Sequence, residues 1–153
     1  MKKLLFSLMA ATLCLMIASC SSSSNKIKSI AEDIKNNGNE WTDPDQWERA
    51  ADDFFVACCE FGESNFSEDE AKEFAKACME VVDAFDNIDN KAAQKALAKG
   101  LKKLGDNDEL GDRLKEAFKK GKERLEELEL DPEDLVSESD LAKAYGLAFK
   151  LMK

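Results

Sequence analysis

DPDQWERAADDFFVACCEFG, residues 43–62, is the stretch of this 153-residue chain that best indicates its fold. Asp43 is a suitable N-cap, Pro44 suits the first helical position, and Gln46 completes a capping-box pattern. Behind this start, apolar residues recur at steps of four and three, which places them on one face of a helix that ends at Gly62. They are Trp47, Ala51, Phe54, Cys58 and Phe61.

A second helix start follows after a short linker. Ser67 and Glu70 form another capping-box pattern, and Phe66 stands where a hydrophobic staple against Ala71 is expected. The apolar residues of this helix again share one face: Ala71, Phe74, Ala75, Cys78, Val81, Val82 and Phe85. Because the linker is short, we expect the two helices to form an antiparallel hairpin.

Helical periodicity also extends to both sides of this hairpin, whereas strand signals are almost absent. The other expected helices are residues 25–37, 91–104, 108–128 and a last one from about 139, with a turn or short helical turn at 131–134. The sequence therefore predicts an all-α fold, a compact bundle or orthogonal array of five to six short helices.

The first twenty residues have the layout of an export signal. Residues 1–3 carry two lysines, and residues 4–17 are almost entirely apolar. That run is shorter than the roughly 20 apolar residues that a membrane-spanning helix needs. Ile17-Ala18-Ser19-Cys20 resembles the lipobox of bacterial lipoproteins. An ordinary secretory signal, with Cys20 as a disulfide partner, is the alternative.

The lipobox resemblance implies a membrane address. In that class the chain is cut before the cysteine, so Cys20 would carry acyl chains such as palmitate on its sulfur and amino group. Each buried methylene contributes about 0.8 kcal/mol, so two or three chains make the attachment practically permanent. The residue directly after the cysteine is Ser21, and in this position the chain resembles lipoproteins that are sent to the outer membrane. We therefore expect an outer-membrane anchor facing the periplasm.

These features divide the chain into three parts. Residues 1–19 are the expected signal peptide, 20–25 the lipidated cysteine with a flexible serine spacer, and 26–153 a single acidic helical domain. The formal net charge of −10 disfavours binding to nucleic acid and favours a basic partner if the domain binds a protein.

Catalytic and metal-binding signals are absent from the sequence. The chain has no histidine, which removes the commonest general base and the commonest zinc ligand. Residues 106–117 partly match a calcium-binding loop, but Leu110 and Ala117 occupy ligand positions, so helix capping explains the segment better. We therefore expect no enzymatic activity, no metal site and no cofactor.

Three cysteines remain once Cys14 is removed and Cys20 is acylated: Cys58, Cys59 and Cys78. An oxidising envelope favours a disulfide. In a hairpin with level ends, however, Cys58 and Cys78 are offset by about 10 Å along the helix axes, too far for a bond. Cys59 points away from Cys58. We therefore expect buried free thiols, with a disulfide as the alternative.

The aromatic residues include a candidate interaction surface. Phe55 cannot share the face of Phe54, and Trp41 precedes the helix cap, so these two side chains are either core residues or an exposed binding patch.

The predicted function is a non-enzymatic, membrane-anchored protein-interaction module. A specific version is an inhibitor or immunity protein that neutralises a basic toxin or hydrolase, with an affinity that falls steeply with salt. The alternative is a carrier of a lipid or other apolar ligand. Its cavity would be lined by Phe54, Phe74, Leu97, Phe118 and Phe149.

Overall fold

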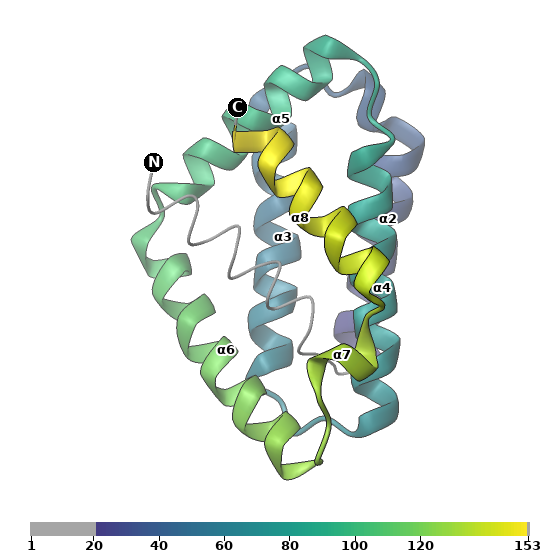
Figure 1. Ribbon diagram of the computed structural model, residues 1–153. Coiled ribbons are helices and arrows are strands. Elements are labelled where there is room, and N and C mark those ends of the chain that lie inside the picture. The colour runs from purple at the N-terminus through teal and green to yellow at the C-terminus, as the bar shows by residue number, and fades with distance from the viewer. Residues whose placement is uncertain (1–20, 153) are drawn as a thin grey trace.

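The structure is a computed structural model that describes residues 21–152; these residues form α-helices and one short 3₁₀ helix, with no strand (Figure 1). The elements are α2 (Ser21–Asn37), η1 (Gly38–Glu40), α3 (Pro44–Gly62), α4 (Glu68–Asp86), α5 (Lys91–Gly105), α6 (Asp108–Glu127), α7 (Pro132–Leu135) and α8 (Glu138–Met152). The all-α prediction is confirmed. The turn or short helical turn expected at residues 131–134 is the short helix α7. The predicted signal peptide and Cys20 lie outside the described residues.

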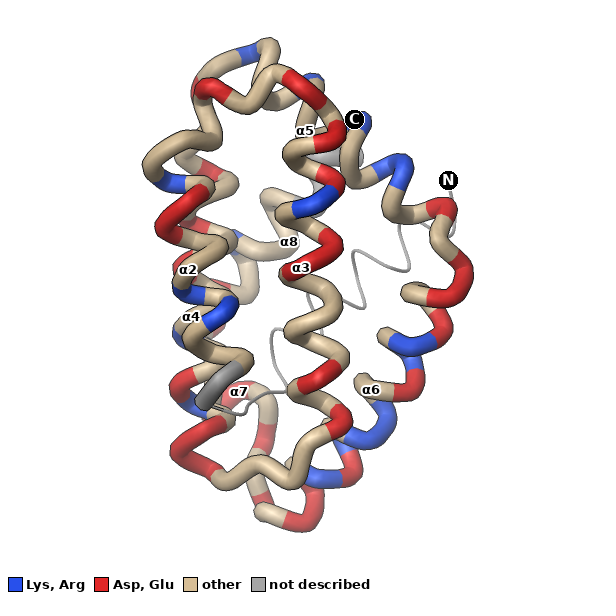
Figure 2. Tube along the Cα trace, turned by 180° about the vertical axis from the view of Figure 1, so that it is seen from behind, with Lys and Arg blue, Asp and Glu red and all other residues tan. Residues whose placement is uncertain are grey.

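Helix α3 occupies the centre of the arrangement. It contacts α2, α5 and α6, while α4 packs against α2 and is covered in turn by α7 and α8. Figure 2 shows α3 between the α2–α4 pair and α6. Because neighbours surround α3 on several sides, its buried residues extend around much of its circumference: Trp47, Ala51, Phe54, Phe55, Ala57, Cys58, Cys59, Phe61 and Gly62.

The predicted helix starts are made by local capping. The Asp43 carboxylate accepts a hydrogen bond from the backbone N–H of Asp45 at 3.0 Å. At α4 the capping box is complete: the Ser67 N–H donates to the Glu70 carboxylate at 2.8 Å, and the Glu70 N–H donates to the Ser67 hydroxyl at 3.3 Å. Asn107 caps α6, so the segment that partly matched a calcium loop is a helix start.

The serine segment differs from the prediction. Helix α2 begins at Ser21 rather than at Asn25, and Ser23 and Ser24 are buried. The expectation of a flexible spacer is therefore wrong for residues 21–25. Serine is small, so these positions allow close packing, and burial of the apolar face of α2 against α4 outweighs the modest helix propensity of serine.

Helices α3 and α4 are antiparallel, but their ends are not level. The ring of Phe61, near the end of α3, stacks on Phe74 in the second turn of α4 with centroids 4.1 Å apart. Phe66 in the linker turns inward and stacks on Phe61 at 4.7 Å. Helix α4 therefore begins beyond the end of α3. This stagger brings Cys58 and Cys78 opposite each other, so the predicted axial offset between them is wrong.

Two glycines permit backbone contact between helices. A Cβ atom on Gly100 of α5 would lie 2.7 Å from the Pro44 carbonyl oxygen and 2.8 Å from the Glu48 nitrogen. A Cβ atom on Gly62 would lie 2.4 Å from the Ala117 carbonyl oxygen. Helices α5 and α6 thus pack against opposite ends of α3, which places the α5–α6 junction beside the first turns of α3.

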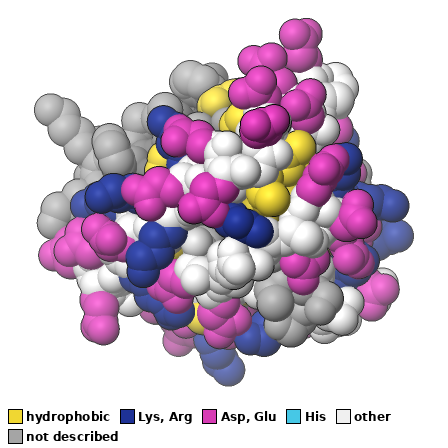
Figure 3. All heavy atoms as spheres, turned by 90° about the horizontal axis from the view of Figure 1, so that it is seen from below, with side chains coloured by type: hydrophobic (Ala, Val, Ile, Leu, Met, Phe, Trp, Pro, Cys, Tyr) yellow, Lys and Arg dark blue, Asp and Glu magenta, His cyan; other side chains and the backbone are white. Residues whose placement is uncertain are grey.

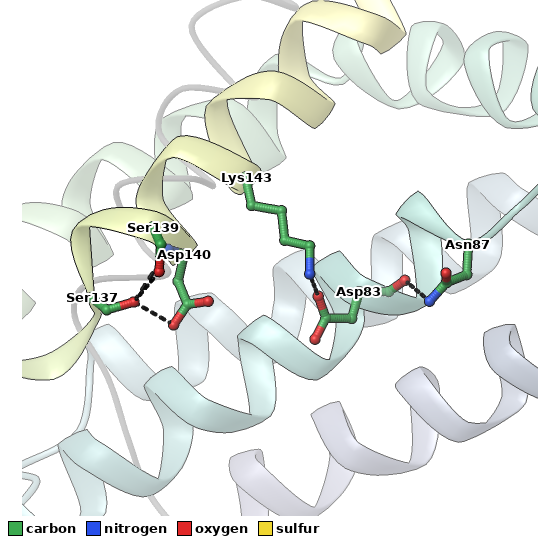
Figure 4. A network of polar contacts seen from close by, with 6 residues as sticks. All are labelled: Asp83, Asn87, Ser137, Ser139, Asp140 and Lys143. Atoms are coloured by element: carbon green, nitrogen blue, oxygen red, sulfur yellow. Dashed lines mark hydrogen bonds and ion pairs between the residues drawn. The ribbon is translucent and has the colours of Figure 1, made fainter.

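Helix α8 is joined to α4 by an ion pair (Figure 4), and its Ala144 is buried in the hydrophobic core. Ser137 caps α8, because its hydroxyl accepts from the Asp140 N–H at 3.2 Å. One turn further along, Lys143 forms an ion pair with Asp83 of α4. Asn87 donates its side-chain amide to the Asp83 carbonyl at 2.8 Å, which closes the end of α4.

Candidate functional site

The predicted aromatic binding surface is not present as such. Phe55 is only 6% exposed and meets the edge of Phe54 at a centroid distance of 5.4 Å, so it is a core residue and its assignment to a surface is wrong. Trp41 is half-buried and packs edge-on against Trp47 at 5.0 Å. Its carbonyl also accepts the Trp47 indole N–H at 2.8 Å. Both aromatic residues therefore stabilise the fold.

The structure instead places an acidic cavity where the start of α3 meets the α5–α6 junction. Its volume is about 540 Å³. Residues from two helices, α3 and α5, and the N-cap of α6 line it: Asp45, Glu48, Arg49, Asp52, Asp53, Leu104 and Asn107. Four carboxylates against one guanidinium give the lining a negative charge, while Leu104 supplies an apolar wall. Such a lining suits a cationic group on an apolar stem.

Lys103 of α5 balances part of this charge at one edge of the cavity. Its ammonium pairs with Asp45 and lies 3.4 Å from the Glu48 carboxylate. The hydrogen bond from Lys103, with its positive charge, lowers the pKa of Asp45. The two acidic residues in return raise the pKa of Lys103. This edge is therefore occupied by an ion-pair cluster that also ties α5 to α3.

Further along α3, the lining carries two adjacent carboxylates, the partly buried Asp52 and the exposed Asp53. Asp52 and Asp53 make no ion pair with any of the residues that the structure describes. Partial burial, followed by the charges of Asp53 and Glu48, raises the pKa of Asp52. A cation in the cavity would relieve this repulsion.

The sequence reasoning did not single out this cavity. Asp45, Glu48 and Asp52 recur at steps of three and four, so they share a helix face opposite the apolar seam. This spacing is present in the sequence, but it does not distinguish the site, because other helices of this acidic chain also carry carboxylates on their solvent faces. Only the packing of Leu104 and Asn107 against α3 distinguishes these residues from the rest.

The cavity begins at the end of α3 that lies opposite the start of α2. Lys26, near that start, forms a 2.7 Å ion pair with Glu60 in the last turns of α3. Asp45 is at the opposite end of α3, and a rise of 1.5 Å per residue separates it from Glu60 by about 22 Å. Figure 3 shows the end of the molecule seen from below, where acidic and basic side chains are interspersed around a few hydrophobic ones.

All three predicted thiols are buried and reduced in the structure. Burial raises the pKa of Cys59 to about 12, with Arg113 opposing the shift, and burial also raises the pKa of Cys58. A thiol reacts as the thiolate, so neither cysteine is a nucleophile near neutral pH. The prediction of buried thiols agrees with this arrangement.

The lining expected for an apolar carrier is mostly packed. Phe74 and Leu97 are 0% and 1% exposed within the core, and Phe74 stacks directly on Phe61. The side chain of Phe149 lies outside the described part of the chain.

Comparison of the chain with protein-family models, with curated proteins and with solved structures finds no significant match. In the described range 21–152, no helix is long and apolar enough to cross a membrane. Over the same range, no group of three or more His, Cys, Asp or Glu residues could hold a metal ion. Fold and cavity together define a small, acidic, all-α protein with a negatively charged recess.

Proposed function

We propose that this protein is a non-enzymatic lipoprotein, anchored to the bacterial outer membrane through Cys20, that binds a basic protein through its acidic cavity. The observation that carries the proposal is a cavity of about 540 Å³ in which Asp52 and Asp53 have no ion-pair partner among residues 21–152. The lipobox resemblance supports the anchor, and the inhibitor or immunity type of module is the specific version.

The cavity suits a lysine or arginine side chain of the partner. Its charged head would pair with Asp52 and Asp53, and its methylene stem would lie against Leu104. A planar guanidinium can make two parallel hydrogen bonds to one carboxylate, so arginine fits this chemistry better than lysine. Binding of the cation would lower the pKa of Asp52 towards its ordinary value.

The position of the cavity is compatible with a membrane anchor. Helix α2 begins at Ser21, directly after the proposed lipid attachment, and its first turns lie beside the end of α3. By the rise of an α-helix, the cavity residues of α3 lie between about 10 Å (Asp53) and about 22 Å (Asp45) from Glu60. A partner could therefore reach the cavity without passing between the domain and the membrane surface.

The binding proposal is tested by crosslinking and affinity capture of the tagged, full-length lipoprotein from intact envelopes. The test variant combines Asp52→Asn and Asp53→Asn. The control combines Glu80→Gln and Glu116→Gln, which removes the same charge from exposed positions of α4 and α6 outside the cavity. We expect one recurrent protein that the wild type and the control retain, and that is lost at high salt and from the test variant.

Two results would contradict this proposal. A recurrent partner that the Asp52/Asp53 variant retains would place binding outside the cavity, and the absence of any recurrent protein would remove the interaction function itself.

The anchor is tested separately by metabolic labelling with a palmitate analogue and by separating inner from outer membranes. We expect label in the outer-membrane fraction and none in a Cys20→Ser variant. Label in the inner membrane, or an unlabelled wild-type protein, would overturn the proposed address.

A further inference from the structure

Cys58 and Cys78 lie opposite each other in the interface between α3 and α4. The Phe61–Phe74 stack sets the local register, and the Trp47–Phe85 pair, with centroids 5.9 Å apart, marks the other end of the same interface. Cys58 is three residues before Phe61 and Cys78 is four residues after Phe74, so an antiparallel pairing makes the two cysteines face each other. Burial, and after it the neighbouring Cys78 thiol, raises the pKa of Cys58, which agrees with this placement.

We propose that Cys58 and Cys78 form a structural disulfide when the chain folds in an oxidising compartment. Each cysteine loses its thiol hydrogen, one S–S bond forms, and the two electrons and two protons pass to a disulfide acceptor that becomes two thiols. The acceptor is glutathione disulfide in vitro and the disulfide of an exported thiol oxidoreductase in the cell. The proposal goes beyond the binding function and shares with it only the export of the chain.

Burial determines when this bond forms. The side chains of Cys58 and Cys78 are 2% and 0% exposed, so the acceptor reaches them before α3 and α4 close, or during a transient opening. A disulfide requires Cα atoms about 4.4–6.8 Å apart, and α3 and α4 meet through side chains more than through close backbone contact, so the two helices must approach locally at Cys58 and Cys78 as the bond closes. The bond then locks the stagger of the hairpin.

Cys59 is the internal control. It is adjacent to Cys58 in the chain but points to another side of α3, where Arg113 of α6 is near its thiol. Among the described residues, Cys58 lies opposite Cys78, and Cys59 has no third cysteine to face. A disulfide between the neighbours Cys58 and Cys59 would disrupt the helix.

The pairing is tested by refolding the purified, detergent-solubilised lipoprotein from denaturant in a mixture of reduced and oxidised glutathione. Free thiols are alkylated under denaturing conditions, and the protein is digested with trypsin without reduction. Cleavage after Arg49, Lys72, Lys76 and Lys91 yields peptides 50–72 and 77–91. We expect these peptides to be linked in the wild type and in Cys59→Ala, and separate in Cys58→Ala and Cys78→Ala.

Stability is the second measurement. Closing the loop from residue 58 to residue 78 should lower the unfolding constant roughly one hundredfold. We expect the oxidised wild type and Cys59→Ala to lose this gain on reduction, while Cys58→Ala and Cys78→Ala are insensitive to reductant. Three alkylated thiols after refolding, or a peptide link that survives in Cys58→Ala, would overturn the pairing.

Protein alkylated directly on lysis of intact cells tests the compartment. The same peptide link in that sample supports the disulfide in the exported chain. If the thiols are free in cells although the peptides are linked after refolding, the disulfide does not form in the cell. That result would not bear on the binding proposal, which has its own test.

Discussion

Replacement of Gly100 by alanine is the most direct test of how α5 is seated on α3. The new Cβ atom would lie 2.7 Å from the Pro44 carbonyl oxygen, 2.8 Å from the Glu48 nitrogen and 2.9 Å from the Trp47 Cβ. The first two of these atoms belong to the backbone, so no side-chain rotation relieves the overlap. The two helices must move apart.

The expected loss of stability follows from two opposing effects. Overpacking a close contact costs about 1–3 kcal/mol, and backbone neighbours place this site near the upper limit. Alanine also favours the helix over glycine by about 1 kcal/mol. The net destabilisation is therefore about 2 kcal/mol, which corresponds to a fall in Tm of roughly 8 °C for a domain of this size.

The assay is urea unfolding of the detergent-solubilised protein, followed by circular dichroism and by tryptophan fluorescence. Gly146→Ala on α8 is the matched control, because nothing lies within 4 Å of the added Cβ atom. We expect this control to stabilise by about 0.5–1 kcal/mol. A Gly100→Ala protein as stable as the control would refute the close approach of α5 and α3, and with it the shape of the acidic cavity.

Three further substitutions and titrations probe individual contacts. Trp47→Phe removes the indole donor to the Trp41 carbonyl and part of a fully buried ring, so it should cost at least about 2 kcal/mol in urea unfolding, and an unchanged midpoint would contradict the contact. The hydrogen bond from Arg113 lowers the pKa of Glu63, so its stabilising effect is present above the unfolded pKa and is lost as the pH falls through the folded value. The stability difference between wild type and Glu63→Gln should therefore shrink as the pH falls below the unfolded Glu pKa of about 4.3 and disappear once the pH is below the folded value, and a constant difference would count against the pair. Burial raises the pKa of Cys59 to about 12 in the folded protein. The buried neutral thiol therefore contributes its full stability below the pKa of the unfolded thiol, and this contribution is lost as the pH rises towards about 12. The Cys59 thiol of the native protein should thus react slowly with a disulfide reagent at about pH 8 and rapidly in denaturant; rapid native labelling would disprove its burial.

Part of the acidic cavity could be predicted from the sequence, and part could not. The three- and four-residue spacing of Asp45, Glu48 and Asp52 places them on one face of α3 whatever the tertiary structure is. The sequence does not show that Leu104 and Asn107 complete a cavity around them, because that depends on how α5 and α6 pack. The same limit applies to Phe55, which is buried because helices surround α3 on several sides.

The sequence by itself determined the all-α class and most helix starts, because capping and periodicity act within a few residues of the chain. The Ser67–Glu70 box and the Asn107 cap are made by side chains that reach backbone groups three residues away. Only the tertiary structure decided the stagger of α3 and α4. It depends on where Phe66 inserts and on ring stacking between distant residues, which the local spacing of apolar residues does not specify. That stagger brings Cys58 to Cys78 and turned two separate cysteines into a candidate disulfide.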